Sequence, residues 1–402
     1  MEKLITPFKK NHFFGYYDKS PLNYSKNFIL SHNVEHEGNS IKKNHFAKIC
    51  LTNLNNYETK IISSTYAWNY QQGSQLQWIS EDKFIFNSFE KHYEAHIFDT
   101  KTFKLNKILV NPIYSISEDK KIYSSVDYSR LNKYREGYGY KQKEYVENEN
   151  LLKICSIENS DVLIELNKSD FQDYKEINFK SCWIDHILFA PNSYDFVFLL
   201  RSSINSENLY SYLFYYDFKN KKIINILDSG TAGHGAWLDE ENFIVWGRYK
   251  KFTKKMNRIN NFFVKKLIKI VKKFGVPPMV RKKLYGDSYI NFNKLEKKSS
   301  KLNLNIPINI AGGHFSFIKE ENLMISDTYH NKQNESIIFS YNLKSKILKK
   351  ITKFRCIPNI RNKSYRCDLH PRIVSRNEII IDSTHEGFRG MYLVRHNDKM
   401  AI

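Results

Sequence analysis

Five side chains at one position of a repeated sequence pattern are of types that bind metals or accept protons. In each copy the position lies three residues before a large hydrophobic residue. It is occupied by Gln75, His186, His234, His314 and His370. Neutral imidazoles that converge from separate strands suit a Mn, Zn or Fe site, and a glutamine oxygen is a weaker ligand. We therefore predict a metal site built from Gln75, His234, His314 and His370.

An imidazole that binds no metal can instead accept a proton near neutral pH. His186 and His234 are the candidates for such a base, and His45 in "NHFAKI" is a weaker third. A plainer interpretation is that side chains lining a water-filled channel are polar without having a function. Four of the 13 histidines share this one position, which favours a function.

A second group of residues follows the strand that comes after each copy of the pattern. Arginine, tyrosine and histidine recur there, as Arg130, Arg135, Arg201, Arg248, Tyr329, His330, His385 and Arg389. Arginine binds carboxylates through two parallel hydrogen bonds, and aromatic rings stack on sugar faces. Charges in loops are often only solvated, which is the alternative for any single arginine. Together the group predicts a binding surface for an anionic sugar.

The segments that carry these residues share one order of elements. In "SQLQWISEDKFIFNSF", from Ser74, a short apolar strand precedes a polar turn and a second hydrophobic strand. Six further copies begin at Tyr16, Ile113, His186, His234, His314 and His370. Most copies are followed by a second hairpin, so each unit has four strands. Seven such units predict an all-β, seven-bladed β-propeller that spans residues 1–402 as one domain.

The propeller places the repeated position around a central funnel, because the first strand of every blade is innermost. After the seventh copy only the strand "GMYLVRH" remains, so the last blade lacks one strand. We expect the N-terminal "KLITPF" to supply it and close the ring. Two β-sandwiches would explain neither the even spacing nor the sevenfold repeat.

Composition excludes several classes of protein. The chain has 402 residues, 41% of them hydrophobic, and no apolar run long enough for a signal peptide or a membrane span. Its five cysteines are scattered and contain no CxxC pair, as expected for reduced thiols. We therefore expect a cytoplasmic protein. The net charge of +21 is concentrated between Arg248 and Gly286, where 14 Lys and Arg occur without Asp or Glu.

Residues 250–286 read as a basic helical insertion within the fifth blade. From 254 to 275 apolar residues recur three and four positions apart with lysines between them, and Gly275, Pro277 and Pro278 end the pattern. Residues 250–283 are therefore predicted to hold the protein at an anionic membrane surface, the inner membrane face. A helix packed on the blade is the alternative. No aromatic-interleaved basic platform accompanies the segment, so nucleic acid is not expected.

Four stretches of the chain resemble the β-propeller polysaccharide lyases, the oligogalacturonate lyase and ulvan lyase group. They are "HFFGYYDKSP", "AWNYQQGSQLQW", "RCDLHPR" and "DSTHEGFRGMYLV". The resemblance implies cleavage of a uronate-containing saccharide by β-elimination. It also implies a divalent metal (Mn, Zn or Ca) and a catalytic pair formed by Tyr114 as acid/base and Arg130 as neutraliser of the carboxylate. Tyr16 and Gln72, within the first two stretches, would contact the substrate.

Two departures from the family leave the function open. Ulvan lyases are exported, whereas this chain shows no export signal, and the basic insertion has no counterpart in either lyase pattern. The leading hypothesis is a lyase whose substrate-binding residues include Arg201, Arg248, Tyr329, His385 and Arg389. The alternative is a non-catalytic propeller that binds surface polysaccharide, or its lipid-linked precursor, at the inner membrane face.

Overall fold

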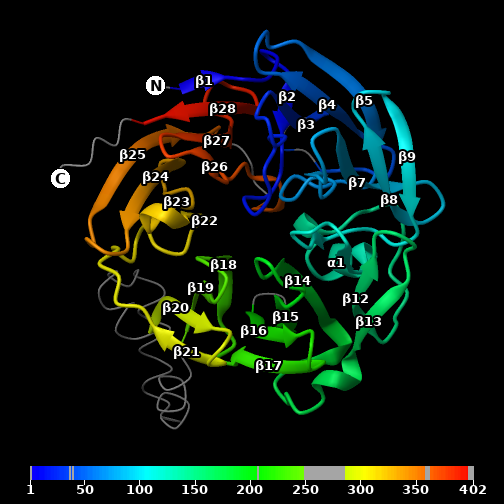
Figure 1. The fold of residues 1–402 in the computed structure, drawn as a ribbon, viewed down its shortest axis with the longest axis vertical. Coiled ribbons are helices and arrows are strands. Elements are labelled where there is room, and N and C mark those ends of the chain that lie inside the picture. Colours follow the sequence, from blue (N-terminus) through cyan, green and yellow to red (C-terminus); the bar gives the residue numbers. More distant parts are fainter. Residues whose placement is uncertain are drawn as a thin grey trace.

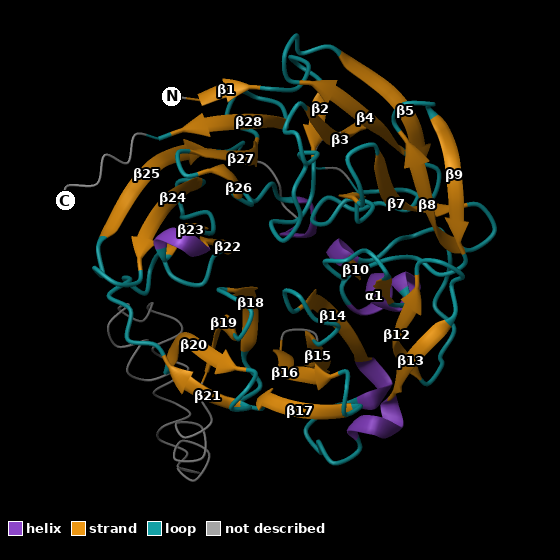
Figure 2. Ribbon diagram, in the orientation of Figure 1, coloured by secondary structure: helices purple, strands orange, loops and turns teal. Residues whose placement is uncertain are grey.

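The computed structural model describes residues 2–35, 38, 40–205, 208–248, 286–357 and 363–396. These residues form seven antiparallel sheets of four strands, arranged as a ring around a central axis (Figure 1). The predicted all-β, seven-bladed β-propeller is therefore confirmed. Short helical turns occur in the loops between strands (Figure 2). The α-helix of the described residues, α1 (Tyr128–Tyr134), follows the second strand of blade 3.

The strands follow one another within each blade in chain order, from the inside outward. Blades 1 and 2 contain β2 (Asn11–Phe13), β3 (Phe28–Val34), β4 (Ala47–Asn53) and β5 (Thr59–Thr65), then β6 (Gln77–Trp78), β7 (Lys83–Phe89), β8 (Tyr93–Asp99) and β9 (Lys104–Leu109). Blades 3 and 4 contain β10 (Ser115–Ile116), β11 (Ile122–Ser125), β12 (Asn150–Ser156) and β13 (Val162–Asn167), then β14 (Cys182–Phe189), β15 (Phe196–Asn205), β16 (Asn208–Asp217) and β17 (Lys222–Leu227).

The remaining blades follow the same order. Blades 5 and 6 contain β18 (Ala232–Trp237), β19 (Asn242–Arg248), β20 (Asp287–Asn293) and β21 (Lys298–Lys301), then β22 (Phe315–Ile318), β23 (Leu323–Asp327), β24 (Glu335–Asn342) and β25 (Leu348–Arg355). Blade 7 contains β26 (Arg372–Ser375), β27 (Glu378–Ser383), β28 (Gly390–Arg395) and β1 (Glu2–Leu4).

The N-terminal strand closes the ring, as expected. Strand β1 pairs antiparallel with β28, with Glu2 opposite Val394 and Leu4 opposite Tyr392. The first strand of the chain is thus the outermost strand of the last blade, where it pairs an edge that would otherwise be open. Figure 1 shows β1 beside β28, with β2 leading into the first blade.

The core lies between neighbouring blades. Strand β7 (Lys83–Phe89) is buried over five consecutive residues because both faces of its sheet pack against another blade. One cluster joins blades 7, 1 and 2 through Ile380, Leu30 and Phe86. All five cysteines are buried free thiols. The ring therefore presents a rigid wall to the central funnel.

The predicted basic insertion lies outside the described residues. Strands β19 and β20 of blade 5 flank it in the sequence. They remain paired up to Arg248 opposite Asp287. In the part of the chain that is described, no helix is long and apolar enough to cross a membrane.

Candidate functional site

Four histidines from four blades meet at the centre of the ring. His186 is in β14 and His234 in β18, whereas His314 and His370 lie just before β22 and β26. All four side chains are buried. The ring of Tyr16 lies among them, with its centroid 5.4, 6.1, 5.7 and 5.0 Å from those of the four imidazoles in chain order. The repeated sequence position thus becomes one cluster in space.

Each imidazole is held through Nδ1, which leaves Nε2 for another partner. The Nδ1 partners are Asp185 Oδ1 at 2.6 Å for His186, Gly313 O at 3.3 Å for His234, Asp327 Oδ2 at 3.0 Å for His314 and Gly15 O at 2.7 Å for His370. A carboxylate or carbonyl that binds the outer nitrogen of a histidine is the usual support of a metal ligand, because it fixes the ring and the tautomer.

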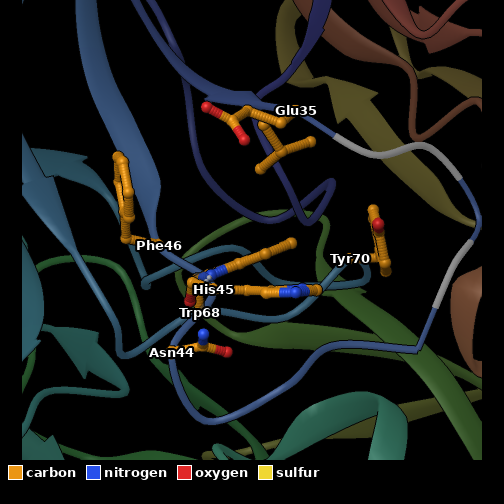
Figure 3. A pocket seen from close by; sticks show the side chains of 7 residues that line it. Glu35, Asn44, His45, Phe46, Trp68 and Tyr70 are labelled. Carbon is orange, nitrogen blue, oxygen red and sulfur yellow. Dashed lines mark hydrogen bonds between the residues drawn. The ribbon is translucent and has the colours of Figure 1, made fainter.

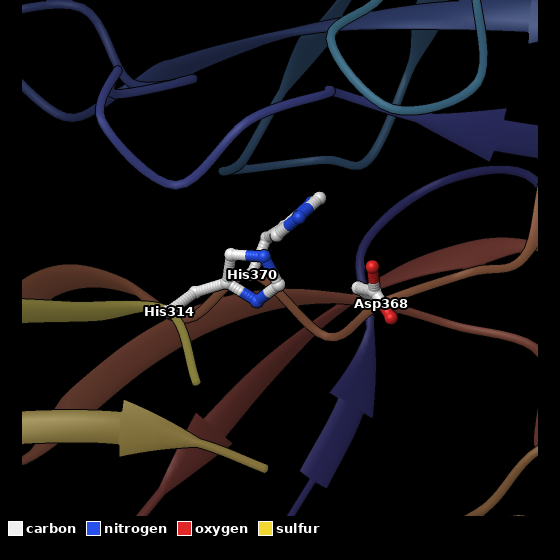
Figure 4. A group of neighbouring side chains, drawn as sticks. All are labelled: His314, Asp368 and His370. Carbon is white, nitrogen blue, oxygen red and sulfur yellow. The ribbon is translucent and has the colours of Figure 1, made fainter. Parts of the chain in front are cut away.

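The structure gathers a candidate metal centre at the blade 6 side of the cluster. His314, Asp368 and His370 have ligand atoms within 4.8 Å of one another (Figure 4). The Nε2 atoms of both histidines are buried without a hydrogen-bond partner among the described residues. Burial, followed by the charges of His314 and Arg372, lowers the pKa of His370 well below its ordinary value. The ring is therefore neutral at pH 7 and can donate a lone pair.

His234 adjoins this centre and also faces a cavity. Its ring centroid is 4.1 Å from that of His314, and its Nε2 is 3.4 Å from the hydroxyl of Tyr329. Burial, with smaller contributions from His314 and His186, lowers the pKa of His234 well below its ordinary value. His234 is thus a neutral proton acceptor or a third nitrogen ligand.

The cavity beside His234 has a volume of about 850 Å³ and lies between blades 4, 5 and 6. Cationic and aromatic side chains form part of its wall, among them Arg135, Arg201, His234, Trp246, Tyr329 and Lys332, together with the carboxylate of Asp287 and several small residues. Four residues of the predicted binding surface therefore line it: Arg135, Arg201, Tyr329 and His330. Such a wall suits an anionic ligand with flat apolar faces.

Tyr114, the predicted acid/base, is buried beside His186. Its hydroxyl accepts hydrogen bonds from Gln72 Nε2 at 2.9 Å and from the backbone N–H of His186 at 2.8 Å. Burial first, and then the charge of Asp185, raise the pKa of Tyr114 well above its ordinary value, so the phenol stays protonated. Gln75, predicted as a metal ligand, uses Nε2 to donate to Gln72 Oε1 at 2.9 Å. Gln72 and Gln75 thus support Tyr114.

Arg130, the predicted neutraliser, lies on α1 and points elsewhere. Its guanidinium donates to the side-chain and backbone oxygens of Asn148, and it does not line the cavity. Arg135, at the C-terminal end of the same helix, does line it. Arg130 lies within the helix, whereas Arg135 is its C-cap with the non-helical φ of -151° and ψ of 72°. Both arginines were predicted at the rim, and the structure brings Arg135 to the cavity but not Arg130, so the expectation for Arg130 was wrong.

Three further residues expected at the rim are placed outside the cavity. Arg248 pairs with Asp287 across β19 and β20, with Nη2 to Oδ1 at 2.8 Å. The ring of His385 packs between Phe354 and Tyr392, with centroids 4.9 and 4.4 Å away. Arg248 is thus bound to Asp287, which lines the cavity although Arg248 itself does not, and His385 packs against Phe354 and Tyr392.

Arg389 is the third of these residues. Its guanidinium is buried, donates to the carbonyl of Tyr365 at 2.9 Å and lies over the ring of Phe13, 5.3 Å from the centroid. His45, the weaker candidate base, lines a separate cavity of about 60 Å³ in blade 1 with Trp68 and Tyr70 (Figure 3). Neither side chain lines the cavity beside His234.

Comparison with known proteins identifies the fold. An oligogalacturonate lyase in complex with manganese matches with a TM-score of 0.65 and 11% identity, over 99% of this chain and 93% of that one. An oligogalacturonate lyase from Vibrio parahaemolyticus matches with a TM-score of 0.61 and 11% identity, over 98% of this chain and 93% of that one. The chain shares the propeller fold of oligogalacturonate lyases.

The fold is not restricted to lyases. A chain of the mitotic checkpoint complex also matches, with a TM-score of 0.53 and 8% identity over 98% of this chain and 94% of that one. No protein-family model matches the sequence, and no curated protein does. Identities this low establish the fold alone, so the activity must be argued from the site.

Sequence reasoning missed the buried carboxylates that organise the histidines. Asp185 directly precedes His186, Asp368 lies two residues before His370, and Asp327 ends β23. The first two occur in the same stretches as the histidines and offered a signal.

A second ligand-type group, Glu90, Glu94 and His96, lies in blade 2, where Glu94 Oε1 is 2.6 Å from His96 Nε2.

Proposed function

We propose that the protein is a lyase that cleaves uronate-containing oligosaccharides by β-elimination. The observation that carries the proposal is the arrangement of carbonyl- or carboxylate-supported histidines beside a cavity lined by two arginines. β-Elimination at a uronate needs an acceptor for the C5 proton and positive charge at the carboxylate. Both are present at one wall of this cavity.

Arg135 and Arg201 bind the substrate carboxylate in this proposal. Both guanidiniums line the cavity, and both are held by the buried carboxylate of Asp185. Trp246 and Tyr329, on the same wall, provide faces on which sugar rings can stack. The expected substrate is therefore an anionic oligosaccharide rather than a neutral one.

The residues of the candidate metal centre fit a divalent cation. His314 and His370 offer buried lone pairs, and Asp368 offers a carboxylate that its neighbour Arg366 keeps anionic, with Nε to Oδ2 at 2.7 Å. This nitrogen and oxygen set suits manganese or zinc. When bound, such a cation supplies Lewis-acid stabilisation of the charge that develops on the uronate.

His234 is the proposed proton acceptor. It lines the cavity, whereas the Nε2 of His186 lies 2.7 Å from the hydroxyl of Tyr16 and is occupied by it. His234 Nε2 takes the C5 proton, the C5–H electrons form the C4–C5 double bond, and the bond to O4 breaks. The leaving oxygen gains its proton from the hydroxyl of Tyr329, and the proton that His234 Nε2 took from C5 then passes to the Tyr329 oxygen, 3.4 Å away, which restores both side chains.

Absorbance of unsaturated uronates in the ultraviolet tests this function. The protein is incubated with manganese and with oligogalacturonate, oligoglucuronate or a neutral oligosaccharide, and absorbance should rise only with the uronates. We expect His234→Gln to lower kcat/KM by about 10²- to 10⁴-fold, the usual contribution of a general base. His45→Gln is the matched control, because His45 lines the separate cavity in blade 1.

A protein that binds uronates but produces no unsaturated product would contradict the lyase proposal. It would favour the non-catalytic polysaccharide-binding alternative, in which loss of His234 is tolerated. The membrane attachment predicted for residues 250–283 is independent of this test.

A further inference from the structure

Asp185 is the most extensively engaged buried carboxylate at the site. It is completely buried, and each of its oxygens has two partners. Oδ1 lies 2.6 Å from His186 Nδ1 and 3.0 Å from Arg201 Nε. Oδ2 accepts from Arg135 Nη1 at 2.8 Å and from Trp183 Nε1 at 3.0 Å. One side chain therefore contacts both cavity arginines and one of the four central histidines.

The backbone of β14 is irregular where it presents this carboxylate. Successive side chains of a strand normally point to opposite faces, which would separate Asp185 from His186. The pairing of β14 with β15 shifts register between Asp185 and Leu188, and His186 has φ of 53°. A bulge with a left-handed residue re-aims side chains at the edge of a site. Here it lets adjacent residues bond through their side chains.

The carboxylate also offsets repulsion between like charges. Arg135 arrives from the end of α1 and Arg201 from β15, so two blades contribute a guanidinium to one region. Two cations at a largely buried site are unfavourable unless an anion lies between them; the side chain of Arg201 is 6% exposed and that of Arg135 is 22% exposed. Burial alone would raise the pKa of Asp185, but Arg201, His186 and Arg135 together hold it well below its ordinary range. Asp185 is thus anionic throughout the physiological pH range.

The bond to Asp185 also determines the tautomer of His186. A carboxylate accepts hydrogen bonds, so Nδ1 carries the proton and Nε2 carries a lone pair. The hydroxyl of Tyr16, 2.7 Å from Nε2, then donates to His186. The direction in which the Tyr16 hydroxyl donates therefore depends on Asp185, because His186 is hydrogen-bonded to both side chains.

We propose that Asp185 is a positioning residue that fixes the tautomer of His186 and holds Arg135 and Arg201 together as a single receptor for one substrate carboxylate. This inference rests on the proposed function for its substrate and on the geometry alone for the tautomer. Neither the sequence pattern nor the shared fold assigns this role.

The test compares Asp185→Asn with Asp217→Asn. Asp217 is the matched control because it is also a buried blade 4 carboxylate, but it pairs with Lys297, Oδ2 to Nζ at 2.7 Å, away from the cavity. The first readout is the ¹⁵N spectrum of histidine-labelled protein at pH 7, in which His186 is assigned by its absence in His186→Gln. We expect the Nδ1–H tautomer in the wild type and in Asp217→Asn, and its loss in Asp185→Asn.

The second readout is the affinity and cleavage of oligogalacturonate and oligoglucuronate. We expect Asp185→Asn to raise KM at least 10-fold and lower kcat, whereas Asp217→Asn should change neither more than about 2-fold. An unchanged His186 tautomer together with an unchanged KM in Asp185→Asn would overturn the inference. A wild type that cleaves no uronate would contradict the proposed function. The tautomer of His186 in the ¹⁵N spectrum would still test the role of Asp185.

Arginine variants test the same arrangement if Asp185→Asn does not fold. Because the two guanidiniums bind one carboxylate as a unit, Arg135→Gln and Arg201→Gln should have non-additive effects on KM. The double variant should be little worse than either single one. Strictly additive effects would show that the arginines act independently and would contradict the inference.

Discussion

Left-handed backbone occurs at three of the five residues that occupy the repeated position. Gln75, His186 and His370 have φ of 57°, 53° and 45°, although none is glycine. Each such residue costs about 1–2 kcal/mol relative to ordinary backbone. Three blades share this cost at the inner end of their first strand. Strain that recurs at converging side chains is typical of a site whose orientation matters more than its stability.

Asp327 provides a test of the metal centre at the scale of one residue. It accepts hydrogen bonds from His314 Nδ1 at 3.0 Å to Oδ2 and from the backbone N–H of His370 at 3.1 Å. Outer partners of this kind tune ligand basicity, so Asp327→Asn should weaken Mn²⁺ binding about 10- to 100-fold by titration calorimetry. Asp217→Asn should bind normally. Equal affinity in the two variants would place the metal elsewhere.

The buried histidines predict how stability depends on pH in metal-free protein. Burial foremost, opposed by Asp185, lowers the pKa of His186 from 6.5 to about 4, and the pKa values of His234 and His370 shift in the same direction. The unfolded chain therefore takes up protons first as the pH falls. The free energy of unfolding should be greatest above pH 6.5 and should decrease towards pH 4.

Urea denaturation in the presence of EDTA measures this decrease. His186→Gln should show a shallower decrease between pH 6.5 and 4 than the wild type, because one titrating group is gone. If the free energy of unfolding depended on pH identically in the two proteins, this would contradict the prediction that His186 is buried and neutral in the folded state.

At the scale of elements, the hairpin of β19 and β20 indicates how blade 5 tolerates its long connection. The two strands pair up to Arg248 and Asp287, whose side chains form an ion pair with Arg248 Nε 2.8 Å from Asp287 Oδ1. The connection therefore leaves and re-enters the sheet at adjacent points. A short linker between them could close the hairpin without disturbing the ladder.

Deletion of residues 250–283 tests the predicted membrane attachment. Rejoining Tyr249 to Leu284 through a Gly/Ser linker should leave the propeller folded. It should abolish co-sedimentation with anionic liposomes, to which each Lys or Arg near the surface contributes ~1 kcal/mol. Binding of the intact chain should weaken as salt rises, because exposed charges are screened over about 8 Å. Equal sedimentation of both forms would exclude the segment as the anchor.

At the scale of the molecule, stability depends on closing the ring. Strand β1 contributes only three paired residues, but Ile5, directly after it, is buried to 1% exposure in the cluster shared by blades 7, 1 and 2. Ile5→Ala should therefore destabilise the protein by about 2–5 kcal/mol, the usual cost of such a truncation in a core.

The control for ring closure is Glu2→Gln in the same strand, because Glu2 is exposed. It should change the free energy of unfolding by no more than about 0.5 kcal/mol. Equal effects of the two substitutions in urea denaturation would show that the contact of β1 with the last blade does not hold the ring closed.

The seven blades, their closure and the column that brings His186, His234, His314 and His370 together could all be predicted from the repeat pattern. These features follow from local rules, since strand periodicity and turns recur in each unit and a ring places equivalent positions around one axis. These features could be predicted without knowing which side chains are in contact.

Which polar side chains reach the cavity depends on contacts between blades that the repeat pattern does not specify. Arg135 reaches it from the non-helical C-cap of α1, whereas Arg130, within the helix, donates to Asn148 instead. Asp185 meets Arg135, 50 residues away, because blades 3 and 4 lie side by side. A repeat fixes the direction of its own strands, but the partner of a buried charge comes from another blade, and no local pattern encodes that pairing.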